Sequence, residues 1–250
     1  MLRHPFHLLC LLVSIAGTCT VAMAREVEFS GQRWVVRSSG GQLSGPGPNV
    51  FSDGLDAVRV DAQGRLRMAI AKTPQGWHSA EVTLSRPLGY GTYELDVETN
   101  PFGMDRQAVF GFFSYSSAPE QAHRELDVEL SYWGRPGEAN NAQFVVQPSG
   151  APDTLRRFQV NHGPVTYRIR WERGLAEFSA TTADGAVLQH WSRTVGVPEA
   201  GDARIQLNLW LFQGKPPQNG QPVEFVVRGF RFSPSGAAGA GPVPVSGPQR

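Results

Sequence analysis

Short runs in which apolar and polar residues alternate recur along this 250-residue chain, and Gly, Pro, Asn and Asp separate them. Successive side chains of a strand point to opposite faces of its sheet, so a period of two predicts strands with one buried face. No window of about a dozen residues keeps the 3.6-residue period of an amphipathic helix. The sequence therefore predicts an all-β protein.

The predicted strands are short, and turn sequences such as the Asp-Ala-Gln-Gly at residues 61–64 join them. They lie at residues 27–29, 33–36, 57–60, 66–71, 80–85, 90–98, 108–114, 124–131, 143–147, 156–160, 166–171, 176–180, 187–190, 204–212 and 223–232. So many closely spaced strands favour two antiparallel sheets packed face to face, as in a jelly-roll sandwich.

The first residues have the features of a secretory signal. An apolar run at residues 8–16 precedes a small-x-small cleavage site at residues 22–24, so we expect residues 1–24 to be removed on export. Both cysteines, Cys10 and Cys19, lie in this segment. We therefore expect a protein secreted to the extracellular space or the periplasm, with no disulfide in the mature domain.

The mature chain is expected to form one domain at residues 25–232, followed by a disordered Pro/Gly-rich tail at residues 233–250. Loss of the signal removes Arg3 and no acid, so the formal net charge falls from +1 to 0. A neutral protein without a further apolar span favours neither nucleic acid nor a membrane as its partner. We expect a monomer that acts on a neutral polysaccharide.

One predicted strand carries three acids. Glu125, Asp127 and Glu129 alternate with apolar residues, so all three share one face of the strand. Paired carboxylates are what cleavage of a glycosidic bond requires. The alternative is an ordinary solvent-facing strand of a sandwich, which the Glu-x-Asp-x-Glu pattern alone does not exclude.

The spacing is compatible with a retaining mechanism. Four residues along a strand place the Cα atoms of Glu125 and Glu129 about 13 Å apart, whereas retention needs about 5 to 5.5 Å between the carboxyl groups. Long side chains on a twisted, concave sheet can close much of this gap.

Other common catalytic signatures are missing. The chain has no Gly-x-Ser-x-Gly elbow and no His-Glu-x-x-His motif, and no cysteine pair survives in the mature part. His78, His123, His162 and His190 are scattered along the sequence. We therefore predict no metal ligands and no required cofactor.

The acidic strand resembles the signature of glycoside hydrolase family 16, the family of lichenases, laminarinases and xyloglucan-acting enzymes. The Tyr-x-x-x-Trp strand at residues 167–171 and the Asn-x-Trp at residues 208–210 are similar to later strands of that family. The resemblance implies a concanavalin-like jelly roll and a retaining endo-glycosidase. It also implies that Glu125 is the nucleophile, Glu129 the general acid/base and Asp127 an assisting carboxylate.

Two details bear on the substrate. The regular spacing, with no extra residue between Asp127 and Glu129, resembles the lichenase and xyloglucan branches and favours mixed-linkage β-1,3-1,4-glucan. Arg124 stands where many members carry an acid, and residues 130–134 differ from the Phe-Leu-Gly of lichenase-like members, which leaves the polymer open. A structural calcium on the convex face, as in some relatives, also stays open.

Six residues near the acids or on neighbouring strands are candidates for sugar binding, because aromatic rings stack on sugar faces and amides bind hydroxyls. They are Tyr132, Trp133, Asn208, Trp210, Trp77 and His78. Packing in the core or at its rim is the alternative for Trp77 and Trp210, whereas strand alternation places Trp171 in the core.

Two other functions fit the same sequence. A sandwich of this kind also occurs in carbohydrate-binding proteins without turnover, so a lectin-like role stays open. A transglycosylase would use the same three acids with a sugar as acceptor in place of water.

Overall fold

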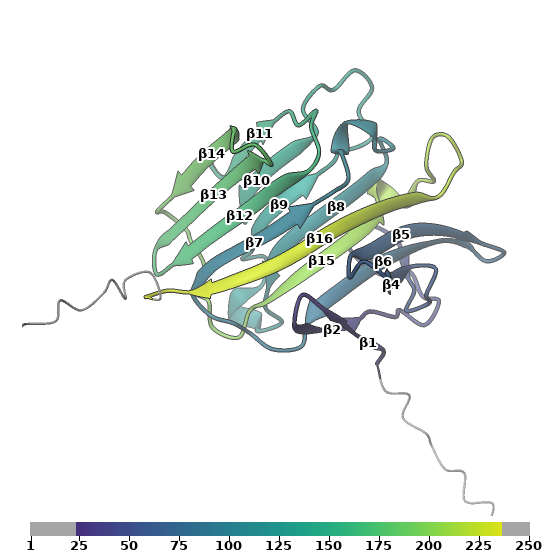
Figure 1. The fold of residues 1–250 in the computed structure, drawn as a ribbon, viewed down its shortest axis with the longest axis horizontal. Coiled ribbons are helices and arrows are strands. Elements are labelled where there is room, and N and C mark those ends of the chain that lie inside the picture. The colour runs from purple at the N-terminus through teal and green to yellow at the C-terminus, as the bar shows by residue number, and fades with distance from the viewer. Residues whose placement is uncertain (1–23, 237–250) are drawn as a thin grey trace, which may run out of the picture.

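The computed structural model describes residues 24–236 as two antiparallel sheets stacked face to face (Figure 1). We call the sheet that contains the three acids the cleft sheet and the other the outer sheet. This all-β jelly-roll sandwich is the predicted fold. The signal predicted at residues 1–24 lies outside the described residues except for Ala24.

Eight strands form the cleft sheet. In spatial order they are β1 (Glu26–Phe29), β2 (Gln32–Val36), β6 (Gly76–Leu84), β15 (Arg204–Leu211), β8 (Ala108–Tyr115), β9 (Leu126–Leu130), β10 (Ala142–Val146) and β11 (Leu155–Phe158). The short β3 (Val50–Phe51) pairs in parallel with β6.

Seven strands form the outer sheet. They are β4 (Val58–Val60), β5 (Leu66–Thr73), β16 (Val223–Pro234), β7 (Gly91–Val97), β12 (Val165–Glu172), β13 (Leu175–Thr182) and β14 (Val187–Arg193). The β5–β6 hairpin joins the two sheets at Ala71–His78. Three short 3₁₀ turns lie at Pro101–Gly103, Pro119–Gln121 and Phe212–Gly214.

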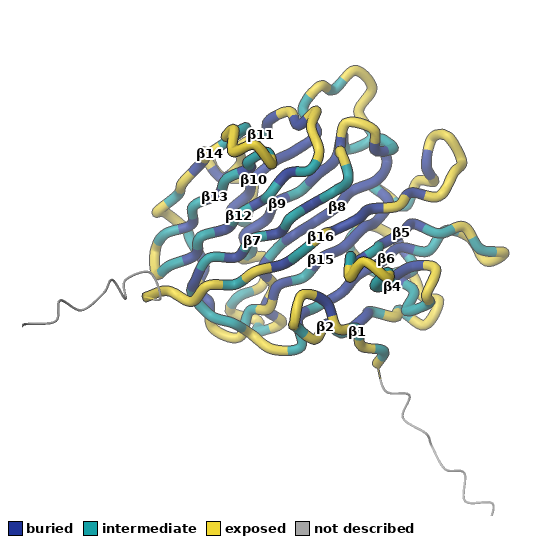
Figure 2. The backbone as a smooth tube through the Cα atoms, in the orientation of Figure 1, coloured by how far each residue is buried: buried dark blue, intermediate teal, exposed yellow. Residues whose placement is uncertain are grey.

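The core lies between the sheets, where the inward faces of alternating strands meet (Figure 2). Phe110 of β8 stacks on Phe225 of β16 with ring centroids 3.8 Å apart, and Phe144 of β10 stacks on Phe178 of β13 at 5.3 Å. Trp171 is buried in this core, as strand alternation predicts. Burial of these aromatic rings from both sheets stabilises the sandwich.

Each predicted strand differs from the observed one at one or both ends, and the short β3 was not predicted. The acidic strand is shorter, β6 begins at Gly76 rather than residue 80, and β16 continues to Pro234, two residues into the predicted tail. The backbone N–H of Ser235 also donates to Tyr90 O. The predicted tail from residue 237 onward lies outside the described residues.

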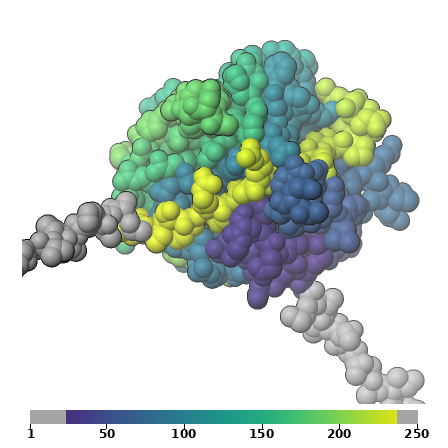
Figure 3. All heavy atoms as spheres, in the orientation of Figure 1, coloured from purple at the N-terminus to yellow at the C-terminus, as the bar shows by residue number. Residues whose placement is uncertain are grey.

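The N-terminal hairpin of β1 and β2 packs beside β16 on one face of the molecule (Figure 3). The Ser30 hydroxyl accepts a hydrogen bond from the backbone N–H of Phe230, which joins the two ends of the domain. Within the described range, none of the helices has the length and apolar character needed to cross a membrane.

Tyr167 offers a test of the core. Its side chain is fully buried between the sheets, and its hydroxyl has no hydrogen-bond partner among the described residues. Burying an unpaired hydroxyl costs about 1 to 3 kcal/mol, so Tyr167→Phe should leave the free energy of unfolding unchanged or raise it. The neighbouring Tyr93 is the matched control, because its hydroxyl donates to Gly89 O. Urea unfolding should show that Tyr93→Phe destabilises; equal losses in both variants would contradict this interpretation.

Candidate active site

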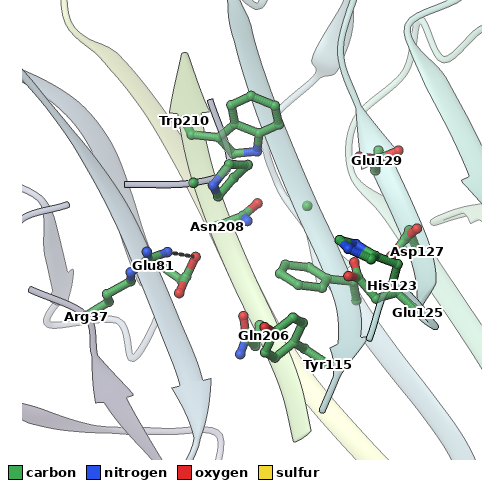
Figure 4. Close-up of a pocket in the computed structure, with 14 residues that line it drawn as sticks. Arg37, Glu81, Tyr115, His123, Glu125, Asp127, Glu129, Gln206, Asn208 and Trp210 are labelled. Atoms are coloured by element: carbon green, nitrogen blue, oxygen red, sulfur yellow. Dashed lines mark hydrogen bonds and ion pairs between the residues drawn. The ribbon is translucent and has the colours of Figure 1, made fainter. Parts of the chain in front are cut away.

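A cleft of about 480 Å³ opens on the exposed face of the cleft sheet (Figure 4). Strands β6, β15, β8 and β9 form its floor, and the loop before β3 forms one wall. The lining residues are Arg37, Gly45, Pro46, Glu81, Gly111, Phe113, Tyr115, His123, Glu125, Asp127, Glu129, Gln206, Asn208 and Trp210.

All three predicted acids line this cleft. Glu125 immediately precedes β9, and Asp127 and Glu129 follow at every second residue. The apolar residues between them are fully buried on the core side of the same strand. Strand alternation therefore places the three carboxyl groups on one face, as predicted.

Strand β9 pairs with β8 on one side and β10 on the other without a register shift. Asp127 lies opposite Phe113 and Glu129 opposite Gly111. No bulge therefore separates Asp127 from Glu129, which agrees with the regular spacing of the sequence.

Gly111 makes the room for the cleft beside Glu129. It lies between Glu129 and Asn208 in the register of β9, β8 and β15. A Cβ atom at Gly111 would lie 2.5 Å from Asn208 Oδ1, which leans across this position. A residue with a side chain here would fill the space next to Glu129.

Two glutamines hold the acids from the β10 side. Gln143 Nε2 donates to Glu129 Oε2 at 2.6 Å, and Gln147 Nε2 donates to Asp127 Oδ2 at 2.9 Å. Arg157 of β11 in turn donates from Nη1 to Gln143 Oε1 at 2.7 Å. Each of these carboxyl groups therefore has a fixed orientation.

Burial gives Glu129 the properties of an acid at neutral pH. It raises the pKa of Glu129 to about 7, and the nearby charge of Glu125 adds to the rise. The hydrogen bond from Gln143 and the positive charge of Arg157 oppose it. Glu129 is thus able to carry a proton where an ordinary glutamate is ionised.

Asp127 and Glu125 are neighbouring acids that influence each other's pKa. Burial, followed by the charges of Glu129 and Glu125, raises the pKa of Asp127 well above its ordinary value. Burial also raises the pKa of Glu125, and the neighbouring His123 and Asp127 oppose this rise in pKa. Asp127 Oδ1 is buried and has no hydrogen-bond partner among the described residues, so a proton on it is available to the neighbouring Glu125.

An ion pair lies across the cleft from the acids. Arg37 Nη1 is 3.0 Å from Glu81 Oε2, and the Arg37 guanidinium also lies 4.1 Å from the ring centre of Phe51. Burial raises the pKa of Glu81, while Arg37 and a hydrogen bond from Asn208 lower it. Asn208 Oδ1 is buried and has no partner among the described residues, so it is available to a ligand hydroxyl.

Among the predicted sugar-binding residues, Asn208 and Trp210 line the cleft. Trp133 does not line it, but its ring packs edge-on against Trp210 with centroids 6.1 Å apart.

The structure places the other three candidates away from the cleft lining. Tyr132 is buried, its hydroxyl donates to Phe102 O at 3.0 Å, and Arg106 covers its ring. Trp77 and His78 lie on the β5–β6 hairpin, where Trp77 packs at the rim of the core. Their positions do not support the predicted contact with a sugar at this site.

Sequence reasoning missed several residues of the site. Arg37, Glu81, Gln143, Gln147 and Arg157 were not among the predicted site residues. A signal existed for Glu81, because a charged residue between Ala80 and Val82 marks the outer face of the strand. Across residues 24–236, no group of three or more His, Cys, Asp or Glu side chains is arranged to hold a metal ion.

No protein-family model matches the chain, and no curated protein matches it either. Solved structures do share its fold. A Bacillus licheniformis β-glucanase superposes with a TM-score of 0.62 at 17% identity, covering 80% of this chain and 91% of that one. A β-1,3-1,4-glucanase (lichenase) from a mouse hindgut metagenome superposes with a TM-score of 0.61 at 16% identity, covering 82% of this chain and 95% of that one.

A third similar structure is Rv0315 of Mycobacterium tuberculosis, described as an immunostimulatory antigen and pseudo β-1,3-glucanase. Its TM-score is 0.61 at 18% identity, covering 81% of this chain and 91% of that one. A family 16 glycosyl hydrolase from Mycobacterium smegmatis has a TM-score of 0.60 at 18% identity, covering 80% of this chain and 91% of that one. The chain therefore has the jelly-roll fold of the lichenase-like β-glucanases of glycoside hydrolase family 16.

Proposed function

We propose that this protein is a secreted, retaining endo-glycosidase that hydrolyses β-linked glucan. The observation that carries the proposal is the row of Glu125, Asp127 and Glu129 on one face of β9 and its N-terminal edge, in an open cleft, with Glu129 able to hold a proton near neutral pH. Two carboxyl groups with different proton affinities are what acid-catalysed glycosyl transfer needs. An open cleft, rather than an enclosed pocket, suits a polymer bound along its length.

The reaction then has two steps. In the first, the proton of Glu129 passes to the glycosidic oxygen, the bond from C1 to that oxygen breaks, and a Glu125 oxygen bonds to C1. In the second, Glu129 takes a proton from water, and the water oxygen displaces Glu125 from C1. Asp127 lines the cleft beside Glu125 and, with a pKa well above its ordinary value, assists Glu125 as a proton donor.

The substrate we propose is mixed-linkage β-1,3-1,4-glucan or a related β-glucan. Two proteins with the same fold are a β-glucanase and a lichenase. The cleft also offers an aromatic ring at Trp210 and polar groups at Asn208 and Gln206 for a neutral sugar chain. Hydrolysis with water as acceptor is preferred to transglycosylation because the cleft is open to solvent.

The test is a panel of barley β-glucan, laminarin, xyloglucan and agarose, with reducing-sugar release measured over time and binding measured in parallel. We expect release from at least one β-glucan, with products of several lengths. Product lengths with an added oligosaccharide acceptor distinguish a transglycosylase, which would make longer chains.

A second candidate is carbohydrate binding without turnover. It is favoured by the pseudo-β-1,3-glucanase among the proteins of the same fold. Binding to a glucan without any release of reducing sugar would support this candidate over the enzyme.

Export completes the proposal and rests on the signal at residues 1–24. Sequencing of the secreted protein should give Arg25 as the first residue, and light scattering should give the mass of a monomer.

A further inference from the structure

Three side chains on adjacent strands form a hydrogen-bonded row that ends on Glu129. Arg157 of β11 lies opposite Gln143 of β10, which lies opposite Glu129 of β9. The distances are 2.7 Å from Arg157 Nη1 to Gln143 Oε1 and 2.6 Å from Gln143 Nε2 to Glu129 Oε2. Gln143 is buried, so water does not compete for either bond.

The direction of this row is set by Arg157. A guanidinium has only donors, so the atom of Gln143 that faces it is the carbonyl oxygen and the amide NH₂ faces Glu129. Arg157 is itself held in place, because Nη2 donates to Asn140 O at 2.6 Å and lies 3.8 Å from Glu138 Oε2. Only 17% of its side chain is exposed.

This direction decides which oxygen of Glu129 carries the proton. Oε2 accepts a hydrogen bond from the Gln143 amide, so a proton bound to Oε2 would compete with the amide hydrogen for the same oxygen. Oε1, which has no such donor facing it among the described residues, is therefore the favoured site for the proton of the acid form. Gln143 lies on the β10 side of Glu129, away from the cleft floor at β8 and β15, so Oε1 is the oxygen that serves the cleft.

We propose that Arg157 is a positioning residue for the general acid: through Gln143 it keeps the transferable proton of Glu129 on the oxygen that faces the substrate. This inference rests on the proposed function. Without Arg157 the side-chain amide of Gln143 is free to flip by half a turn. Its carbonyl oxygen would then face Glu129 and accept a hydrogen bond from a proton on Oε2. The proton would remain bound but would point at Gln143 instead of the glycosidic oxygen.

Arg157→Met tests this, because it keeps most of the volume and removes every donor. A glucan needs protonation of its leaving oxygen, whereas a 2,4-dinitrophenolate leaves without it. We expect kcat/KM for barley β-glucan to fall by roughly tenfold or more, as part of the 10²–10⁴-fold that a general acid contributes. Release of dinitrophenolate from a 2,4-dinitrophenyl β-cellobioside or β-laminaribioside should stay close to wild type.

Two further arginine substitutions serve as controls. Arg156→Met removes an exposed arginine from the same strand, on its opposite face, and should leave both substrates unaffected. Arg157→Lys keeps a donor and a charge and should recover much of the glucan activity. If Arg157→Met fails to fold, Gln143→Met replaces it and should show the same difference between the two substrates.

The outcomes separate the inference from the function. A wild type that acts on neither substrate overturns the proposed function, and the inference with it. A wild type that is active, with Arg157→Met either unchanged or equally impaired on both substrates, overturns the inference alone. Loss confined to the glucan supports it.

Discussion

Glu125→Gln should abolish hydrolysis of every glucan that the wild type cleaves. The amide cannot bond to C1 as a carboxylate does, and it cannot stabilise the positive charge that develops on the sugar ring. Losses on the order of 10⁴-fold or more are expected when a nucleophile is removed. The substitution keeps the shape of the side chain, so the melting temperature should change little.

Glu129→Gln should act differently. It removes the proton donor but leaves the nucleophile, so hydrolysis of glucan should fall by about 10²–10⁴-fold. The first burst of dinitrophenolate from an activated glycoside should survive in Glu129→Gln and be absent in Glu125→Gln. Initial rates and burst amplitudes measure both effects.

Glu94→Gln is the matched control for these two variants. Glu94 lies on β7 of the outer sheet, pairs with Arg231 and is remote from the cleft. Its substitution should leave hydrolysis unchanged. Full activity in Glu125→Gln, or equal loss in all three variants, would contradict the assigned roles.

The second large effect is the pH dependence of hydrolysis. Glu129 has to be protonated to start the reaction, and its pKa is raised to about 7. We therefore expect kcat/KM to fall tenfold per pH unit well above pH 7. At low pH, protonation of Glu125 should lower kcat/KM. Because burial raises the pKa of Glu125, the midpoint of this fall should lie above the ordinary pKa of a glutamate. A profile that stays flat to pH 9 would contradict the role of Glu129.

The same titration should appear in the stability of the wild type. The pKa of Glu129 rises from 4.5 to about 7 on folding, so the folded state binds its proton more tightly than the unfolded state. This contribution is fully present below pH 4.5 and is lost as the pH rises through 7. A shift of this size corresponds to at most about 3 kcal/mol. Urea unfolding at pH 5 and pH 8 should show the loss in the wild type and a smaller one in Glu129→Gln.

Strand alternation predicted the central features of the site. A period of two is a local property, so the sequence alone placed Glu125, Asp127 and Glu129 on one face and the residues between them in the core. The same reasoning placed Asn208 and Trp210 on the outer face of β15, where both line the cleft.

Partners across strands were beyond prediction, because they depend on register between segments far apart in sequence. Gln143 is 14 residues from Glu129, and Arg37 is 44 residues from Glu81. The depth of the cleft depends on Gly111, which nothing local distinguishes from other strand glycines. Its role follows only from its place between Glu129 and Asn208.

The turn after β9 explains why Tyr132 does not line the cleft. The Ser131 hydroxyl donates to Ala108 O and accepts from the backbone N–H of Trp133, which has a φ of 54°. Strand alternation therefore ends at Leu130, and residues beyond it cannot be assigned to a face by counting. Tyr132 turns inward instead, and its hydroxyl binds Phe102 O.

The most direct test of the central claim is to trap the covalent intermediate. The substrate is a 2,4-dinitrophenyl 2-deoxy-2-fluoro-β-cellobioside or β-laminaribioside. Its fluorine destabilises the cationic transition states of both steps, whereas its good leaving group speeds only the first step. The glycosyl ester therefore forms faster than it is hydrolysed, and it accumulates. Mass spectrometry of the intact protein and of its peptides then locates the sugar. We predict one added glycosyl group, carried by Glu125. A label on any other residue, or hydrolysis of glucan without a label, would contradict the account.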